Sequence, residues 1–267
     1  MPDMRSSALI LLPCALDSTS DPDQAVPQPV LTALRALDHF VVEDAKSARA
    51  WLKRCAWPKP LMQASMLVWD EHVAASEAQR LACIESVIAW LEAGHSVGLL
   101  SEAGLPAVAD PGQALIAAVH QAGFAIRPMV GPSSIMLALM ASGLNGQHFE
   151  FKGYLPAEVS QREASLRAME RLSRQDGRSL IWIETPYRND AMVESILRCL
   201  DADTRLCVAS ALGTQNETIR SASIHDWRRH SWRPGREPSV FILACAPPSA
   251  KSARVGQDLK PDHRKHL

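Results

Sequence analysis

Short apolar runs alternate with longer amphipathic runs in the first half of the chain, and this alternation constrains the fold more than any other feature. Strands that alternate with helices form a mostly parallel sheet with helices on both faces. Residues 1–142 are therefore predicted to form a parallel α/β domain. The expected strands are residues 8–13, 39–44, 96–102 and 124–130, and the expected helices are residues 29–37, 46–54, 77–94 and 113–123.

The second half has a different pattern, because several of its apolar runs follow one another without a helix between them. Such runs favour antiparallel pairing, so residues 148–247 are predicted to form a second α/β domain with a mixed sheet. Gly143, Asn145 and Gly146 interrupt the helical pattern that begins at Ser133, which places the linker near residues 143–147. Residues 248–267 contain few apolar side chains, and we expect this tail to be disordered. The expected strands are residues 148–155, 179–184, 205–210, 217–223 and 239–246, with helices at 162–175 and 190–200.

Charge is divided unevenly between the two halves. Residues 1–150 hold 9 Lys and Arg against 15 Asp and Glu, whereas residues 151–267 hold 19 against 14. A basic half suits a partner that carries phosphates, although ordinary surface variation gives the same imbalance. No apolar run approaches the 18 or so residues of a membrane span, and no secretory signal is recognisable at the start. We therefore expect a cytoplasmic protein without a membrane partner.

Common signatures of metal and nucleotide sites are missing from the sequence. The six cysteines form no CxxC pair, and no cluster of Cys and His has the spacing of a zinc site. No GxGxxG follows a strand, and no GxxxxGK followed by Ser or Thr occurs. These patterns predict no metal and give no support to a dinucleotide or P-loop site.

The segment LLSEAGLPAVADPG, residues 99–112, is the strongest local signal. It follows a buried strand, and ligands of parallel α/β sheets bind beyond the carboxyl ends of the strands. Gly104 allows the backbone to approach a ligand closely, and two prolines stiffen the loop. The segment is either a loop over a pocket or a plain crossover connection.

Two further segments carry polar groups at strand ends. Ser133 and Ser134 follow a strand and open a helix, so they either hold polar atoms of a ligand or cap that helix. Glu184 and Thr185 end an apolar strand before Pro186, and the carboxylate either accepts hydrogen bonds from a ligand or caps the next helix.

Taken in order, six segments resemble the motifs of one family. SEAGLPAVADPG (101–112) resembles S-D-A-G-T-P-x-x-x-D-P-G, and VGPSS (130–134) resembles P-G-P-C/S-A/S. KGYLP (152–156), IETPYR (183–188), ASALGTQNETIRSA (209–222) and VVEDAKSARAWL (41–52) resemble E/K-G-F/Y-L-P, Y-E-S/T-P-x-R, A-R-E-L-T-K-x-x-E-x-x-x-G and A-E-D-T-R-x-T. These are motifs of the ribosomal small-subunit methyltransferase I group within the tetrapyrrole methylases, and the resemblance runs from about residue 9 to residue 246.

The resemblance implies two α/β domains with S-adenosylmethionine, the methyl donor, in the cleft between them. It also implies a homodimer and an acceptor in 16S ribosomal RNA, a ribose 2′-hydroxyl. Carried over by position, the expected donor-binding residues are Leu12, Pro13, Gly104, Leu105, Val108, Ser133, Ser134, Glu184, Ala211, Leu212, Pro238 and Ser239.

Departures from the family pattern fall mainly on the acceptor side. The first loop, LPCALDSTSD, lacks a glycine and a proline of the pattern, and E-D-T-R is replaced by Glu43-Asp44-Ala45-Lys46. A ribose hydroxyl benefits from a base or from a cation that stabilises developing negative charge, and Glu43 and Lys46 are the expected catalytic residues. Glu43 and Asp44 equally suit the cap of the following helix. Glu102 and Asp110 are further acids expected at the cleft.

Two other functions remain open at this stage. One is a methyltransferase that acts on a tetrapyrrole or another small acceptor. The other is a non-catalytic protein that keeps the donor-binding fold and binds nucleic acid or a partner.

Overall fold

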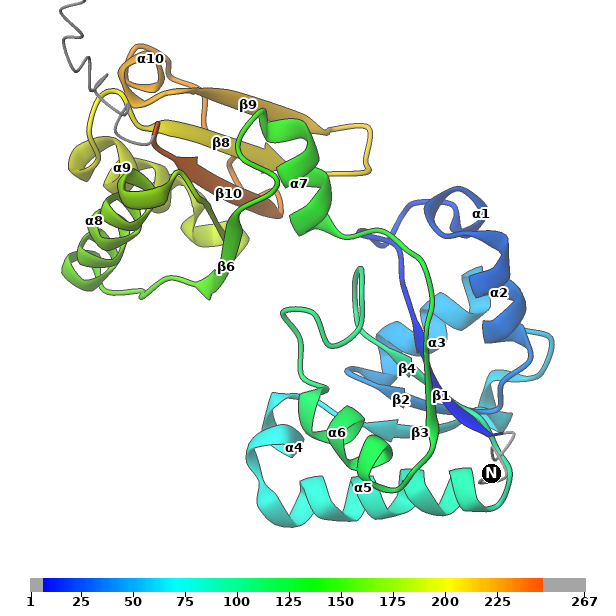
Figure 1. Cartoon of the computed structure of the whole chain (residues 1–267). Helices are drawn as coiled ribbons and strands as arrows, with labels where there is room; N and C mark the ends of the chain where they lie inside the picture. Colours follow the sequence, from blue (N-terminus) through cyan, green and yellow to red (C-terminus); the bar gives the residue numbers. More distant parts are fainter. Residues whose placement is uncertain (1–6, 247–267) are drawn as a thin grey trace, which may run out of the picture.

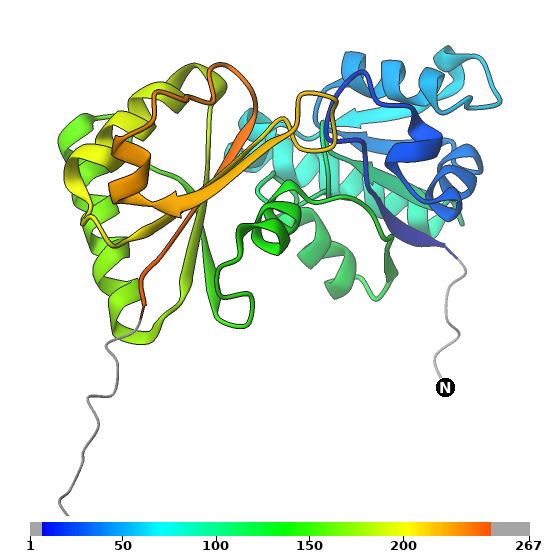
Figure 2. The ribbon, with the colours of Figure 1, turned by 90° about the horizontal axis from the view of Figure 1, so that it is seen from above.

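Two five-stranded sheets, each with its own helices, lie side by side in the computed structural model, which describes residues 7–246 (Figure 1). Figure 2 shows the same two bodies from above, with the polypeptide crossing between them. The α/β class with two sheets expected from the sequence is confirmed. The tail at residues 248–267 lies outside the described residues.

The first sheet is entirely parallel, with the strand order β3-β2-β4-β1-β5. Its strands are β1 (Ala8–Leu12), β2 (His39–Val42), β3 (Ser65–Val68), β4 (Val97–Leu100) and β5 (Ala125–Pro128). Its helices are α1 (Pro22–Ala25), α2 (Gln28–Arg35), α3 (Ala45–Arg54), α4 (Glu71–Ala75), α5 (Glu77–Glu92) and α6 (Gln113–Gln121), with the short 3-10 helix η1 (Leu61–Gln63).

Two hydrophobic cores cover the two faces of this sheet, because successive side chains of a strand point to opposite sides. Phe40 and Val42 of β2 pack in the core built on α2 and α3. Val41, between them, packs in the core built on α5 and α6. Trp51 of α3 is buried in the same core as Phe40 and Val42.

The second sheet is mixed, with the strand order β6-β7-β10-β8-β9 and a single parallel pair, β6 with β7. Its strands are β6 (Phe149–Tyr154), β7 (Ser179–Glu184), β8 (Arg205–Ser210), β9 (Thr218–Ser223) and β10 (Ser239–Ala244). Around them lie α7 (Ser134–Ser142), α8 (Val159–Asp176), η2 (Pro186–Arg188), α9 (Asn189–Cys199) and α10 (Ile224–Arg228). The antiparallel pairing expected from the sequence is confirmed.

Helix α7 packs on the second sheet, although the sequence places it on the amino-terminal side of the linker. Ile135, Ala138 and Leu139 share a core with side chains of β7, β8 and β10. This helix is apolar around most of its circumference, so periodicity alone does not show which sheet it covers. The chain therefore crosses between the two bodies at residues 129–133, before α7 rather than after it, and we propose this segment as the domain boundary.

Within residues 7–246 the structure contains no helix that is both long and apolar enough to span a membrane.

Candidate active site

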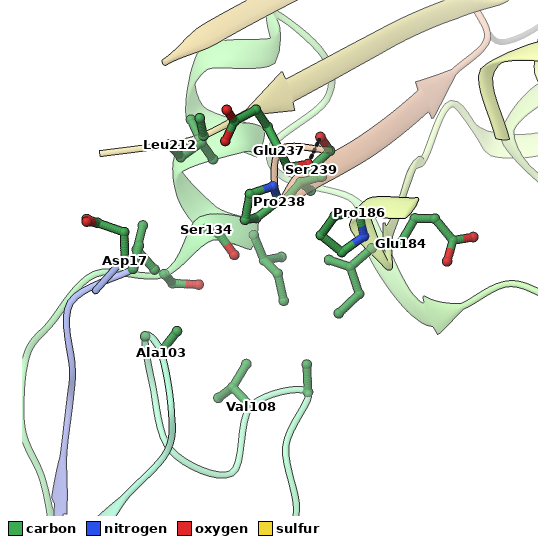
Figure 3. Close-up of a pocket in the computed structure, with 18 of the residues that line it drawn as sticks. Asp17, Ala103, Val108, Ser134, Glu184, Pro186, Leu212, Glu237, Pro238 and Ser239 are labelled. Carbon is green, nitrogen blue, oxygen red and sulfur yellow. Dashed lines mark hydrogen bonds between the residues drawn. The ribbon is translucent and has the colours of Figure 1, made fainter. Parts of the chain in front are cut away.

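A cavity of about 410 Å³ lies between the two sheets (Figure 3). One side of it is formed by the loop that follows β4 at the carboxyl edge of the parallel sheet, where ligands of such sheets bind. The other side is formed by the ends of β7, β8 and β10 and by the start of α7. Its volume and its mostly apolar lining with a few polar groups are those of a small-molecule site.

All but two of the predicted donor-binding residues line this cavity. They come from segments far apart in the sequence: Gly104, Leu105, Val108, Ser133, Ser134, Glu184, Ala211, Leu212, Pro238 and Ser239. The fold thus brings the segments that carry the family resemblance together around one space. That these residues bind a methyl donor stays a prediction.

Leu12 and Pro13 do not line the cavity. Leu12 is fully buried in the core of the first sheet, and Pro13 packs against Gly131, where a Cβ would lie only 2.1 Å from the proline ring. The reason is that the chain stays paired beyond β1 with the loop that follows β4, since the Cys14 N–H donates to the Gly104 carbonyl at 2.9 Å. Leu16 and Asp17 are the residues of this loop that reach the cavity.

The loop of residues 101–112 is held in an unusual backbone conformation. Gly104, Ala107 and Ala109 all have φ between +63° and +69°, a region that favours glycine. Ala107 packs tightly on Gly112, because a Cβ added to Gly112 would lie 2.7 Å from the Cβ of Ala107. Backbone strain of this kind is concentrated at functional sites, which favours the interpretation as a pocket loop over a plain crossover.

Ser133 and Ser134 have different roles at the start of α7. Ser133 caps the helix, because its hydroxyl accepts a hydrogen bond from the N–H of Met136 at 3.4 Å. The Ser134 hydroxyl points toward the space between the two walls in Figure 3. Ser133 is therefore the capping residue, and ligand contact by Ser134 stays a prediction.

The second sheet contributes polar side chains that are already paired with each other. The buried carboxylate of Glu184 accepts a hydrogen bond from the Thr185 N–H at 2.7 Å and lies 2.9 Å from the Arg188 guanidinium. In Figure 3 this carboxylate points away from the cavity. The Ser210 and Ser239 hydroxyls pair at 2.8 Å. A ligand would therefore meet mainly backbone atoms and the surface of paired side chains at this wall, with few unpaired polar side-chain groups.

Carboxyl groups gather where β2 and β4 end. Burial raises the pKa of Asp110, in the cavity wall, to about 7, and the neighbouring Glu43 adds to that rise. Burial also raises the pKa of Glu43, and it raises that of Tyr154, which faces these acids from β6. The local electrostatics thus favour neutral acids at this edge of the cavity.

The two predicted catalytic residues lie beside the cavity rather than in its wall. The Glu43 carboxylate accepts a hydrogen bond from the Glu102 N–H at 3.2 Å, which ties the end of β2 to the loop after β4. Asp44, not Glu43, caps α3, since its carboxylate accepts a hydrogen bond from the Ser47 N–H at 2.6 Å. Lys46 lines a neighbouring hollow of about 530 Å³, which shares Leu16, Asp17 and Ala103 with the cavity.

Several lining residues were not among the predicted site residues. They are Leu16, Asp17, Ala103, Ala109, Ile135, Tyr154, Ile183, Thr185, Pro186, Thr214, Glu237 and Val240, whereas Asp110 was expected at the cleft and does line it. Most of them lie within one or two positions of a residue that was predicted, so the motifs find the segments but not which side chains face inward. Among residues 7–246 no group of three or more Cys, His, Asp and Glu is arranged to hold a metal ion.

Comparison with known proteins gives one consistent family. The family model of the tetrapyrrole (corrin/porphyrin) methylases matches residues 26–227. The chain is 35% identical to a ribosomal RNA small subunit methyltransferase I of Pseudomonas aeruginosa, over 80% of this chain and 72% of that protein. It is 29% identical to the protein of the same name from Mesorhizobium japonicum, over 86% of this chain and 72% of that protein.

Solved structures show the same fold at lower identity. A diphthine synthase superposes with a TM-score of 0.59 at 16% identity and covers 90% of each chain. The methyltransferase CobJ superposes with a TM-score of 0.56 at 17% identity, over 90% of this chain and 95% of that one. With the family model covering most of the residues around the cavity, the chain belongs to the tetrapyrrole methylases and is a methyltransferase.

Proposed function

We propose that the cavity between the two sheets binds S-adenosylmethionine and that the chain methylates a ribose 2′-hydroxyl of small-subunit ribosomal RNA. The observation that carries this proposal is that the loop of residues 101–112 and the turns at Ala211 and Pro238 line one cavity. Membership of the methylase family supports the donor, and the names of the curated relatives support the acceptor.

The residues present suit such a donor. Gly104 suits a tight turn in the cavity wall, because its φ of +69° disfavours a side chain and a Cβ there would lie 3.3 Å from Leu16 Cδ2 and 3.5 Å from the Pro132 carbonyl oxygen. Ala211, with φ of +52°, turns the chain sharply at the opposite wall. A cavity with close main-chain approach and an apolar lining can hold an adenosyl group through backbone hydrogen bonds and contact with Val108 and Leu212.

S-adenosylmethionine supplies an activated methyl group on a sulfonium, so the protein contributes mainly by holding the acceptor hydroxyl in line. Loop 101–112 and the start of α7 are the segments that would hold the donor, with Ser134 offering a hydroxyl toward it. The acceptor enters from the side on which Glu43 and Lys46 lie, next to the loop after β4.

Helix α3 supports a nucleic-acid acceptor. Lys46, Arg49 and Lys53 are exposed along it, while Trp51 and Leu52 are buried behind them. Arg54 is different, because its guanidinium donates to the Ser20 carbonyl and lies over the ring of Trp51. Lys46 lines the hollow next to the cavity, and the exposed Arg49 and Lys53 follow it along the same helix. Such a series of cations suits phosphate groups, which position RNA without reading its sequence.

The proposed function is tested by transfer of a labelled methyl group to small-subunit RNA from a strain that lacks the gene, with the product mapped by mass spectrometry. A 2′-O-methylated nucleotide is the expected product. RNA affinity should fall steeply with salt, and Lys46→Ala with Arg49→Ala should lower the salt slope by about two units or slightly less while donor affinity stays unchanged. Labelling of a tetrapyrrole or another small molecule instead of RNA would overturn the acceptor.

Two further expectations accompany this proposal: the protein acts in the cytoplasm and it forms a homodimer. Apolar side chains remain exposed around α7, where Val130 and Met140 are each more than three-quarters exposed, and a second copy of the chain would cover such a surface. Light scattering at tens of micromolar is expected to give the mass of two chains, and the mass of one chain would contradict the dimer.

A further inference from the structure

Within residues 7–246, Asp110 is the carboxyl group of the cavity wall that is neither held by backbone N–H groups or an ion pair nor turned away from the cavity. Asp17 is engaged by the Thr19 and Ser20 N–H groups at 2.7 and 2.9 Å, and Glu184 by Thr185 and Arg188. Glu237 is exposed, and its carboxylate points away from the cavity in Figure 3. Among the described residues the hydrogen-bonding neighbour of Asp110 is the Ser101 hydroxyl, which lowers the pKa of this carboxyl and which also donates to the Ala103 carbonyl at 3.1 Å.

The position of Asp110 is set by the strained part of the loop. Ala109, immediately before it, has φ of +67°, and Pro111 follows it with a fixed φ of its own. Ala107, two residues further back, is pressed against Gly112. The loop therefore folds back on itself and holds the carboxyl on the cavity side, at the edge nearest β2 and β4.

Acidic and neutral groups surround Asp110, and no cation is among the groups that shift its pKa. Glu43 comes from the end of β2 and Glu102 from the end of β4, while Tyr154 faces it from β6 and Cys14 from the loop after β1. Burial comes first among the causes that raise the pKa of Asp110 to about 7, and the charge of Glu43 comes next. A general base with a pKa near the working pH is ionised in a large share of the molecules and still binds a proton well enough to accept it during the reaction.

We propose that Asp110 accepts the proton of the acceptor hydroxyl during methyl transfer, and that Glu43 is a positioning residue that makes this carboxylate more basic. The inference rests on the proposed function. The hydroxyl oxygen forms a C–O bond to the methyl carbon as the C–S bond of the donor breaks, and the hydroxyl proton passes to Asp110. A sulfonium cation and a carboxylate become a neutral thioether and a neutral carboxylic acid, so charge is conserved without a further reactant.

A binding measurement tests this assignment without turnover. At pH 7 a carboxyl with a pKa of about 7 is about half protonated, and a cation bound nearby favours its ionised form. Calorimetry in buffers of different ionisation enthalpy should therefore show the release of up to about half a proton when S-adenosylmethionine binds. S-adenosylhomocysteine, which lacks the positive charge, should release much less, and Asp110→Asn should remove the difference between the two ligands. Equal proton release by the parent and by Asp110→Asn would overturn the assignment.

The pH profile of methyl transfer to ribosomal RNA is the second test of the assignment of Asp110. Asp110→Asn should lower kcat by about 100-fold or more, with donor affinity and melting temperature close to those of the parent. Glu43→Gln should move the acidic limb of the kcat profile to lower pH, because it removes a like charge beside Asp110. Glu92→Gln, which removes an exposed acid at the end of α5 and at the opposite edge of the same sheet, is the matched control and should leave the limb in place.

The outcomes separate the two proposals. A parent protein that methylates RNA while Asp110→Asn retains its kcat, or while Glu43→Gln leaves the limb unmoved, overturns the assignment of these residues alone. A parent protein that binds the donor but methylates no RNA overturns the proposed function, and the proton acceptor falls with it.

Discussion

The two walls of the cavity are built in opposite ways. The loop wall, residues 101–112, has three residues in the left-handed backbone region and a carboxyl group whose pKa is raised to about 7. The strand wall, at the ends of β7 and β10, has polar side chains that are buried and paired, such as Glu184 with Arg188 and Ser210 with Ser239. Side chains that are paired with each other keep the strand wall in one shape. The loop wall, with its strained backbone, presents a carboxyl group that no ion pair among the described residues holds. We infer that the strand wall shapes the site and that the loop wall carries its chemistry.

The largest expected effect is on the stability of the strand wall. Glu184→Ala leaves the partly buried Arg188 without its carboxylate, and removal of one partner of a buried ion pair costs about 3 kcal/mol. Urea denaturation of this variant should show that loss. Asp38→Ala, which breaks the exposed pair with Lys59, is the control and should cost less than about 1 kcal/mol. Similar losses in both variants would mean that the strand wall is not held by its internal pairing.

The next effect is on the pH dependence that the loop wall gives to stability. The pKa of Asp110 in the folded protein, about 7, lies above its ordinary value of 3.8, so folding favours the protonated carboxyl. The stability that this provides is fully present below about pH 4 and is lost as the pH rises through about 7. Because the group is only partly buried, solvent screening limits the loss to about 2 kcal/mol. The free energy of unfolding of Asp110→Asn, compared with the parent from pH 4 to pH 8, should lack this component; parallel curves would contradict it.

A smaller effect is expected on ligand binding at the loop wall. Val108→Trp fills part of the cavity and should weaken S-adenosylhomocysteine binding at least tenfold, which is about 1.4 kcal/mol. Val159 has the same exposed fraction, 45%, but lies at the start of α8 outside the cavity. Val159→Trp is therefore the matched control and should bind as the parent does. If both variants bind equally well, the donor does not contact the loop wall.

The smallest effect separates capping from catalysis next to the loop wall. Asp44→Ala removes the hydrogen bond to the Ser47 N–H at the start of α3 and should lower stability by about 1 kcal/mol. Donor affinity and the pH profile of activity should not change, because Asp44 does not line the cavity. A shifted pH profile would assign Asp44 a role that its neighbour Glu43 is proposed to have.

Much of the fold could be predicted from the sequence, because long periodic segments and buried apolar runs are strong signals. Residues 179–184 and 205–210 coincide with β7 and β8. Some short elements were missed: β3 has four residues at the edge of its sheet and no alternation of buried and exposed side chains, and α4 has only five residues. The sequence also could not show which sheet α7 packs on, because this depends on which sheet its apolar surface contacts.

For the site, the motifs located the segments, but the direction of each side chain depends on tertiary contacts. Leu12 was expected at the donor because it ends the first strand, yet the pairing of Cys14 with Gly104 delays the turn until Leu16 and Asp17. The sequence located Glu43 and Asp110 near the cleft. The raised pKa of Asp110 could not be found from the sequence, because it depends on burial and on a neighbour 67 positions away.

The central claim is that the cavity between the two sheets is a methyl-donor site, and calorimetry with S-adenosylhomocysteine tests it most directly. The purified protein should bind this ligand with a Kd in the micromolar range, about −8 kcal/mol, and Val108→Trp should weaken that binding while Val159→Trp should not. No detectable binding at millimolar ligand, or binding that is insensitive to Val108→Trp, would contradict the claim.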